Sequence, residues 1–174
     1  MSGKIILNLA VSIDGYISDP DGGFEWLAGD GSHALDTETK LDFESFLQDI
    51  DVVVMGHRCY EQGLHKDYGT KDVYVAASHP EKDCENIHFI NGDIVETIKQ
   101  LKSKGKNIYL FGGGVLVDPF IKANAIDEYI IGVIPTILGK GRKLFYENNP
   151  QIDLKLEAYS VDNGIVIMKY SKRE

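Results

Sequence analysis

The apolar residues of this chain fall into short runs that are rich in Val, Ile and Tyr and are separated by polar segments. Runs of this length and composition are typical of strands that are buried in a sheet. We therefore expect β-strands at residues 5–11, 52–55, 73–77, 87–90, 108–111, 129–134 and 165–170.

Helical patterns lie between several of these strands. The clearest covers residues 93–104, where Asp93 is suited to cap the helix, Glu96 completes a capping box and Gly105 follows the last turn. A second helix is expected over residues 37–48, which contain a cluster of apolar side chains.

The order of these elements predicts the fold class. Strands that alternate with helices favour a largely parallel sheet with helices on both faces. In the last third of the chain the alternation stops, and residues 156–161 and 165–170 flank the pair Asn163-Gly164. Asn-Gly is typical of a two-residue hairpin turn, so the sheet is expected to end in an antiparallel hairpin. The prediction is an α/β fold with a mixed sheet, in one domain that spans residues 1–174.

The composition of the chain limits the functions that it can have. With 174 residues, of which 43% are hydrophobic, the chain can bury the core of one domain. A formal net charge of -9 argues against binding to nucleic acid or to an anionic membrane surface. Cys59 and Cys84 have no metal-ligand spacing, so we expect neither a disulfide framework nor a metal site. The apolar residues 5–11 are too few to span a membrane, and we expect a cytoplasmic protein.

Candidate ligand-binding residues follow four of the predicted strands. They are Gly15, Gly56, Ser78, His79, Gly112, Gly113 and Gly114. In open α/β sheets, ligands bind at the carboxyl ends of the strands. The glycines match neither the G-x-G-x-x-G fingerprint nor a P-loop, which excludes the common dinucleotide-binding and NTPase motifs. We expect these strand ends to form one anion-binding cleft.

The three consecutive glycines at residues 112–114 have two interpretations. Glycine is needed where φ is positive or where the backbone approaches a ligand, and N–H groups at the start of the following helix can hold a phosphate. The alternative is a tight turn between a strand and a helix. The pair Asp118-Pro119 is itself typical of a helix start, which places the helix after the glycines or breaks it at the proline.

An adjacent basic pair, His57-Arg58, follows Gly56. The planar guanidinium of an arginine can donate two hydrogen bonds to one phosphate, which makes Arg58 a candidate phosphate ligand. The alternative is a pair of solvated loop residues. The position of the pair after a glycine at a strand end favours the ligand role.

Several segments, taken together in their order and spacing, resemble one known family. They are residues 10–15 (Ala-Val-Ser-Ile-Asp-Gly), 55–61 (Met-Gly-His-Arg-Cys-Tyr-Glu), 111–115 (Phe-Gly-Gly-Gly-Val), 126–128, 133–141 and 144–145. Over nearly the whole chain, the sequence is similar to the dihydrofolate reductase fold family. It resembles most the branch that contains the C-terminal reductase domain of bacterial riboflavin biosynthesis.

This resemblance implies NADPH as the cofactor and hydride transfer as the reaction. The residues that it places around the cofactor are Ala10, Gly15, Gly56, His57, Arg58, Cys59, Ser78, His79, Gly112, Gly113, Gly114, Val115 and Leu116. Many members have Arg where this chain has His57 and Thr where it has Cys59. The expected contact with the 2′-phosphate therefore rests on Arg58 or His79.

The resemblance also implies a substrate side and an unusual backbone bond. It places Asp42 as the catalytic acid, with Phe46 on the same helix and Trp26 in a lid over the substrate. Two alternatives come from the residues themselves: Asp42 as an acid that stabilises a helix N-terminus, and Trp26 as a core residue. The family further implies a cis peptide bond between Gly112 and Gly113.

The sequence therefore predicts an NADPH-dependent reductase that transfers hydride to a small heterocycle, pterin or pyrimidine-like, or to a carbonyl compound. Two alternatives stay open: the 5-amino-6-ribosylaminouracil phosphate reductase of riboflavin biosynthesis, and a nucleotide-binding module without turnover. We expect a homodimer, because the apolar residues 129–138 suit a strand at a sheet edge; an interior strand has the same pattern.

Overall fold

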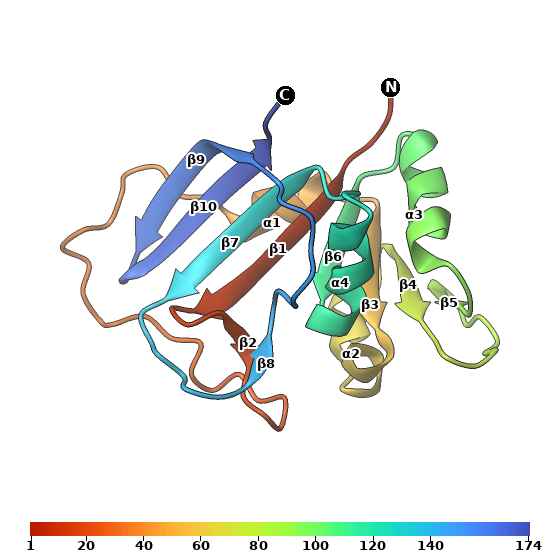
Figure 1. Ribbon diagram of the computed structural model, residues 1–174, viewed down its shortest axis with the longest axis horizontal. Coiled ribbons are helices and arrows are strands. Elements are labelled where there is room, and N and C mark those ends of the chain that lie inside the picture. The colour runs from red at the N-terminus through yellow and green to blue at the C-terminus, as the bar shows by residue number, and fades with distance from the viewer.

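The computed structural model describes residues 1–174 and contains an eight-stranded sheet in the order β5-β4-β3-β6-β1-β7-β10-β9 (Figure 1). The strands are β1 (Ile5–Ser12), β3 (Val52–Gly56), β4 (Asp72–Ala76), β5 (Ile87–Ile90), β6 (Ile108–Gly112), β7 (Glu128–Ile134), β9 (Leu154–Asp162) and β10 (Ile165–Lys172). Every neighbouring pair from β5 to β7 is parallel, and β10 is antiparallel to both β7 and β9. The predicted mixed sheet with an antiparallel C-terminal hairpin is confirmed.

The hairpin turn lies at the predicted pair Asn163-Gly164. Both residues have positive φ, 51° and 78°. A two-residue loop with positive φ at both positions matches the right-handed twist of the strands that it joins, and Asn and Gly tolerate this conformation better than other residues. The local sequence therefore determined this connection.

Four α-helices and one 3₁₀-helix connect the strands. They are α1 (Phe43–Gln48), α2 (His57–Glu61), η1 (Leu64–Tyr68), α3 (Ile94–Ser103) and α4 (Gly114–Lys122). The prediction for α3 is confirmed, and its cap Asp93 accepts a hydrogen bond from the Glu96 N–H at 3.0 Å. No helix combines the length and the apolar character that a membrane span requires.

The helix predicted for residues 37–48 was wrong in its first half, since α1 starts at Phe43. The preceding segment bonds to the C-terminal hairpin instead. Thr37 N–H donates to the Val161 carbonyl at 3.0 Å, and Leu41 N–H donates to Ser160 Oγ at 3.2 Å. These tertiary hydrogen bonds satisfy backbone groups that a helix would otherwise use.

The helix start expected at Asp118-Pro119 was also wrong, because α4 begins at Gly114 and continues through Pro119. A proline inside a helix costs about 3 kcal/mol. Leu116, Val117 and Phe120 of this helix are buried against the sheet, and each such burial contributes about 1.5–3 kcal/mol. Burial therefore outweighs the hydrogen bond that the proline cannot donate.

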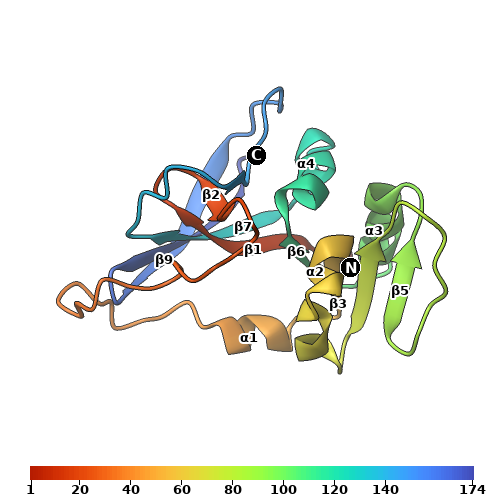
Figure 2. The ribbon, with the colours of Figure 1, turned by 90° about the horizontal axis from the view of Figure 1, so that it is seen from below.

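The helices cover both faces of the sheet, as predicted. In Figure 2, α3 and α4 lie on one side of the strands and α1 lies on the other. The first core cluster contains Ile98 of α3 and Phe120 of α4, while Tyr68 and Val75 belong to the second cluster on the opposite face.

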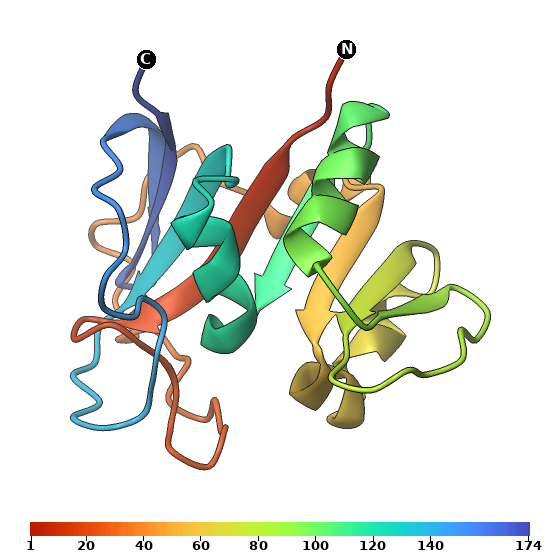
Figure 3. The same ribbon diagram turned by 45° about the vertical axis from the view of Figure 1, so that its right-hand side comes forward.

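Strands β1 and β6 separate at their carboxyl ends. They pair only from Ile5 to Leu7 and from Ile108 to Leu110. Beyond these residues, β1 stays paired with β7 and β6 stays paired with β3. Figure 3 shows that β1, β6 and β3 point in one direction, with α2 following the end of β3. The divergence opens the sheet at the edge where ligands were expected.

A small ribbon of two strands, β2 (Tyr16–Ser18) and β8 (Arg142–Lys143), lies beside the end of β1. The ribbon pairs one segment near the N-terminus with one from the last third of the chain. Its strands are too short to produce a periodic sequence signal, and they were not predicted.

Candidate active site

A cleft of ≈ 730 Å³ opens where β1 and β6 diverge, a size typical of sites for small molecules and cofactors. It is formed by the carboxyl ends of β1, β3, β4 and β6, by the starts of α2 and α4, and by residues of β8 and the loop that follows β2. The predicted site residues that line it are Ala10, Gly56, His57, Arg58, Cys59, Ser78, Gly112, Gly113, Gly114, Val115 and Leu116.

Five predicted site residues lie outside the lining: Gly15, Trp26, Asp42, Phe46 and His79. The Gly15 carbonyl accepts a hydrogen bond from Leu144 N–H at 3.2 Å and so joins β2 to the chain beyond β8. Phe46 stacks edge-on against Tyr109, and it is Tyr109 that reaches the cleft. The half-buried Trp26 donates to the Gly23 carbonyl, while its neighbours Phe24 and Leu27 line the cleft in its place.

Asp42 is the N-cap of α1. Its exposed carboxylate accepts hydrogen bonds from the N–H of Glu44 and from the N–H and hydroxyl of Ser45. The hydroxyl of Ser45 is the main cause that lowers the pKa of Asp42, followed by the Ser45 N–H. A carboxylate held in its charged form, away from the cleft, is poorly suited to donate a proton. We therefore assign Asp42 to the helix terminus, the second role that the sequence left open.

This assignment predicts the behaviour of two variants. Asp42→Asn keeps a capping oxygen and is expected to leave turnover within about twofold of the parent. Asp42→Ala removes the cap and is expected to lower the melting temperature slightly, with turnover again unchanged. Steady-state rates at saturating substrate, measured beside thermal melts, check both. A large loss of turnover in Asp42→Asn would restore the catalytic role.

Basic side chains and no carboxylate line the cleft. His57, Arg58 and Arg142 line it, and none of its lining residues is Asp or Glu, although the chain carries 27 acidic residues and a net charge of -9. A site that excludes carboxylates from an acidic protein provides a favourable local potential for an anionic ligand.

The two residues of the basic pair His57-Arg58 have different surroundings. Nε2 of His57 lies 2.6 Å from Glu81 Oε1, and Nδ1 lies 3.3 Å from Glu61 Oε1, so two carboxylates already face this imidazole. Arg58 is exposed and makes no ion pair or side-chain hydrogen bond. Arg58 is therefore the side chain that is free to bind a phosphate.

Cys59 packs against the glycine turn at the bottom of the cleft. Its Sγ lies 3.7 Å from the Gly112 carbonyl oxygen. Burial raises the pKa of this thiol, and the N–H of Gly113 is the largest of the opposing influences. The protonated thiol therefore acts as a small packing group rather than as a nucleophile.

Tyr109 joins the diverging strands. Its buried hydroxyl donates to the Asn8 carbonyl at 3.1 Å, just beyond the last pair of β1 and β6. Burial raises the pKa of Tyr109 well above its ordinary value, which keeps the hydroxyl neutral and able to donate this bond.

The three glycines have different surroundings. The peptide bond between Gly112 and Gly113 is cis, as the resemblance implied, and Gly112 has φ of +117°. A Cβ on Gly113 would meet only Ile17 Cδ1, at 3.6 Å, an ordinary contact distance. A Cβ on Gly114 would lie 2.4 Å from the carbonyl oxygen of Lys143, which is backbone. Gly114 therefore serves packing against β8, which neither interpretation included, while the space beside Gly113 is open and belongs to the cleft.

Some cleft residues were not recognised in the sequence. They are Asn8, Phe24, Leu27, Tyr109, Phe111, Arg142 and Tyr146. Asn8 could have been recognised as a candidate, because it is a polar residue that interrupts an apolar strand. Arg142 directly follows Gly139-Lys140-Gly141, a segment that carries the family resemblance.

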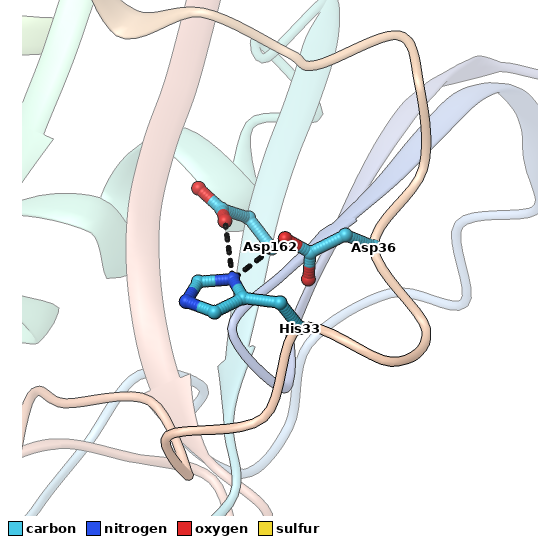
Figure 4. Close-up of side chains that lie close together, drawn as sticks. All are labelled: His33, Asp36 and Asp162. Carbon is cyan, nitrogen blue, oxygen red and sulfur yellow. Dashed lines mark hydrogen bonds and ion pairs between the residues drawn. The ribbon is translucent and has the colours of Figure 1, made fainter.

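A second cluster of polar side chains lies outside the cleft lining, between the loop before α1 and the end of β9 (Figure 4). His33 Nδ1 is 2.8 Å from Asp36 Oδ2 and 4.0 Å from Asp162 Oδ1. The ammonium of Lys40 lies 3.5 Å from Asp36 and 3.7 Å from Asp162, so a cation of the chain already pairs with both carboxylates. We interpret the cluster as an ion-pair network that fastens this loop to the hairpin.

Solved structures share this fold. A putative riboflavin biosynthesis protein from Shewanella sp. PV-4 aligns with a TM-score of 0.79 and 26% identity, covering 98% of this chain and 99% of that one. Dihydrofolate reductase from Enterococcus faecalis, complexed with NADP(H), aligns with a TM-score of 0.67 and 16% identity over 100% of this chain and 99% of its own. The chain therefore has a dihydrofolate reductase-like fold.

The family follows from the sequence comparisons. The model of the RibD C-terminal domain matches residues 64–167. The uncharacterized protein YwjB of Bacillus subtilis (strain 168) is 36% identical over 163 residues, which cover 90% of this chain and 91% of that protein. The chain belongs to the RibD C-terminal domain family, which confirms the resemblance seen in the sequence.

Proposed function

We propose that this protein is an NADPH-dependent reductase that transfers hydride to a small heterocyclic or carbonyl substrate. The observation that carries the proposal is the cleft itself: three basic side chains and no carboxylate line it, and the Gly112-Gly113 turn forms part of its wall. The NADP(H) complex of the similarly folded dihydrofolate reductase supports the choice of cofactor. The two free cysteines agree with the cytoplasmic location that we propose.

The residues of the cleft fit a dinucleotide phosphate. Arg58 offers an unpaired guanidinium, and Ser78 offers an exposed hydroxyl at the end of β4. The Val115 side chain is 79% exposed in the first turn of α4, where a bound cofactor would cover it. Bound NADPH supplies the hydride, so these residues need only bind and orient it.

The other end of the cleft suits a flat substrate. The cleft lining also includes the apolar and aromatic side chains of Phe24, Leu27 and Phe111, and Asn8 adds a polar group. Aromatic walls favour a planar ring. Because no carboxylate lines the cleft, we assign the proton that completes the reduction to solvent.

The test is the oxidation of NADPH by the purified protein against a panel of pterins, pyrimidines and small carbonyl compounds. The panel includes a phosphorylated ribosylaminopyrimidine, which is the substrate expected for the riboflavin-pathway alternative. Turnover of that compound alone would favour this alternative. Tight NADPH binding without turnover of any compound would favour the binding module, and absence of NADPH binding would refute the reductase.

The acidic neighbours of His57 lead to a prediction about coenzyme preference. Glu81→Gln is expected to raise the affinity for NADPH by about threefold to tenfold, because it frees His57 for the 2′-phosphate. NADH lacks this phosphate, so its affinity is expected to stay the same. Titration of both nucleotides into the variant, with Glu38→Gln as a control, measures the change. Weaker NADPH binding in Glu81→Gln would show that His57 does not serve the phosphate.

We also propose a homodimer, with a different contact surface from the one first considered. The sequence suggested an edge strand at residues 129–138, but β7 lies between β1 and β10 and has no free edge. At the other end of the sheet, Leu156, Tyr159 and Val166 are 50%, 60% and 36% exposed. Their pairing across β9 and β10 places all three on one face. Such a patch of apolar side chains is typical of a contact surface.

In sedimentation at micromolar concentration, the parent is expected to behave as a dimer and Tyr159→Lys as a monomer. Lys155→Gln, a substitution of a charged residue on the same strand, is expected to remain dimeric. A parent that sediments only as a 19.4 kDa species would remove the dimer.

A further inference from the structure

Arg142 is the one cleft cation that no sequence motif assigned. It lies on β8, whose next residue, Lys143, places its carbonyl oxygen against Gly114 at the start of α4. The guanidinium donates one hydrogen bond, to the Pro20 carbonyl at 3.3 Å, and makes no ion pair. Four of its five N–H groups are therefore free for a ligand.

The guanidinium lies beside the loop that follows β2 and borders the cleft. Arg142 and Cys59 of α2 both line the cleft. While burial is the main influence and raises the pKa of Cys59, the positive charge of Arg142 acts in the opposite direction, so its field reaches the α2 side. Gly22 also lies beside the guanidinium, since a Cβ there would be 2.9 Å from Nη1.

The order of the strand ends along the cleft indicates which part of a bound dinucleotide would lie beside Arg142. The cleft follows the strand ends β4, β3, β6 and β1, with Ser78 and Arg58 near one end and Ala10 at the other. A dinucleotide phosphate laid along this row, with its 2′-phosphate at Arg58 and its reactive ring at Ala10, has its diphosphate over β6. The end of β6 is the Gly112-Gly113 turn, and Arg142 is carried next to the glycine that follows it.

We propose that Arg142 binds the diphosphate of the dinucleotide, while Arg58 binds its 2′-phosphate. This assignment rests on the proposed function, because it takes NADPH as the ligand. The planar guanidinium presents two parallel N–H groups to phosphate oxygens. Gly114 and Val115, the first two residues of α4, line the same cleft, and their N–H groups have no helical acceptor. Since β8 is paired with β2, the same contact fastens the ribbon over the bound cofactor.

The experiment distinguishes the roles of the two arginines by the nucleotides that each variant binds more weakly. Titration calorimetry measures the affinities of Arg142→Gln and Arg58→Gln for NADPH, NADH and adenosine 2′-monophosphate, which has no diphosphate. For Arg142→Gln we expect about tenfold weaker binding of both NADPH and NADH, equivalent to about 1.4 kcal/mol, and unchanged binding of adenosine 2′-monophosphate. For Arg58→Gln we expect the reverse pattern: NADPH and adenosine 2′-monophosphate weaken, and NADH does not.

Lys143→Gln is the matched control, because Lys143 is the neighbouring cation on β8, is exposed and does not line the cleft. It is expected to bind all three nucleotides as the parent does. If Arg142→Gln binds NADH within about twofold of the parent, or if it also loses adenosine 2′-monophosphate, the assignment of Arg142 is overturned and the reductase proposal stands. If the parent binds neither NADPH nor NADH, both proposals fail.

Discussion

Replacing Gly113 by alanine is expected to weaken NADPH binding by at least about tenfold while the melting temperature of the cofactor-free protein stays close to that of the parent. The reason is spatial. The new Cβ has room in the folded chain, where Ile17 Cδ1 at 3.6 Å is its only neighbour. That space is part of the cleft. The methyl group would therefore occupy space that the proposed cofactor needs.

Calorimetric titration of NADPH into Gly113→Ala, beside thermal melts without cofactor, decides the matter. Gly69→Ala is a suitable control, because a Cβ at Gly69 meets nothing within 4 Å and the residue lies outside the cleft. If Gly113→Ala melts much earlier but binds NADPH normally per folded molecule, the glycine serves only a turn and the cofactor has been misplaced.

Replacing Gly114 by alanine is expected to have the opposite result, with a loss of about 3 kcal/mol in the free energy of unfolding. The added Cβ would lie 2.4 Å from the Lys143 carbonyl oxygen. Backbone cannot move aside as a flexible side chain can, so either α4 or β8 must shift. For a domain of this size, this loss corresponds to a melting temperature lower by about 6–12 °C.

Chemical denaturation of Gly114→Ala and Gly113→Ala, measured side by side, tests this contrast. The two substitutions add the same methyl group at adjacent positions, so differences in side-chain propensity are small. Equal stability of the two variants would show that β8 does not pack on the start of α4 as described.

Much of the fold could be predicted from the sequence. The strand at residues 87–90 matches β5 exactly in its bounds, and Asp93, Glu96 and Gly105 located α3. These signals are local, since apolar period, capping residues and turn residues act within a few positions of one another. The errors at residues 37–42 and at Pro119 arose where tertiary contacts outweighed local preference.

The candidate site could be predicted only in part. Gly56, the glycines at 112–114 and His57-Arg58 were found because ligand sites in α/β sheets follow strand ends, a rule that needs no knowledge of side-chain packing. The same rule also selected Gly15 and His79, which do not line the cleft. Asp42, Phe46 and Trp26 were placed by resemblance alone, and none of them lines the cleft. Whether a side chain on a loop or a short helix faces a cleft depends on packing that the sequence does not display.

The sequence by itself determined the strands of the main sheet, the helix α3 and the antiparallel hairpin, because each follows from local periodicity or from turn chemistry. The order of these elements also indicated the edge of the sheet at which the cleft lies. Only the tertiary structure decided that Gly113 faces the cleft while Gly114 faces β8, and that Arg142 shares the cleft with Arg58. The physical reason is that these relations depend on how segments far apart in the chain pack together. A difference of one residue in that packing exchanges open space in the cleft for a steric clash.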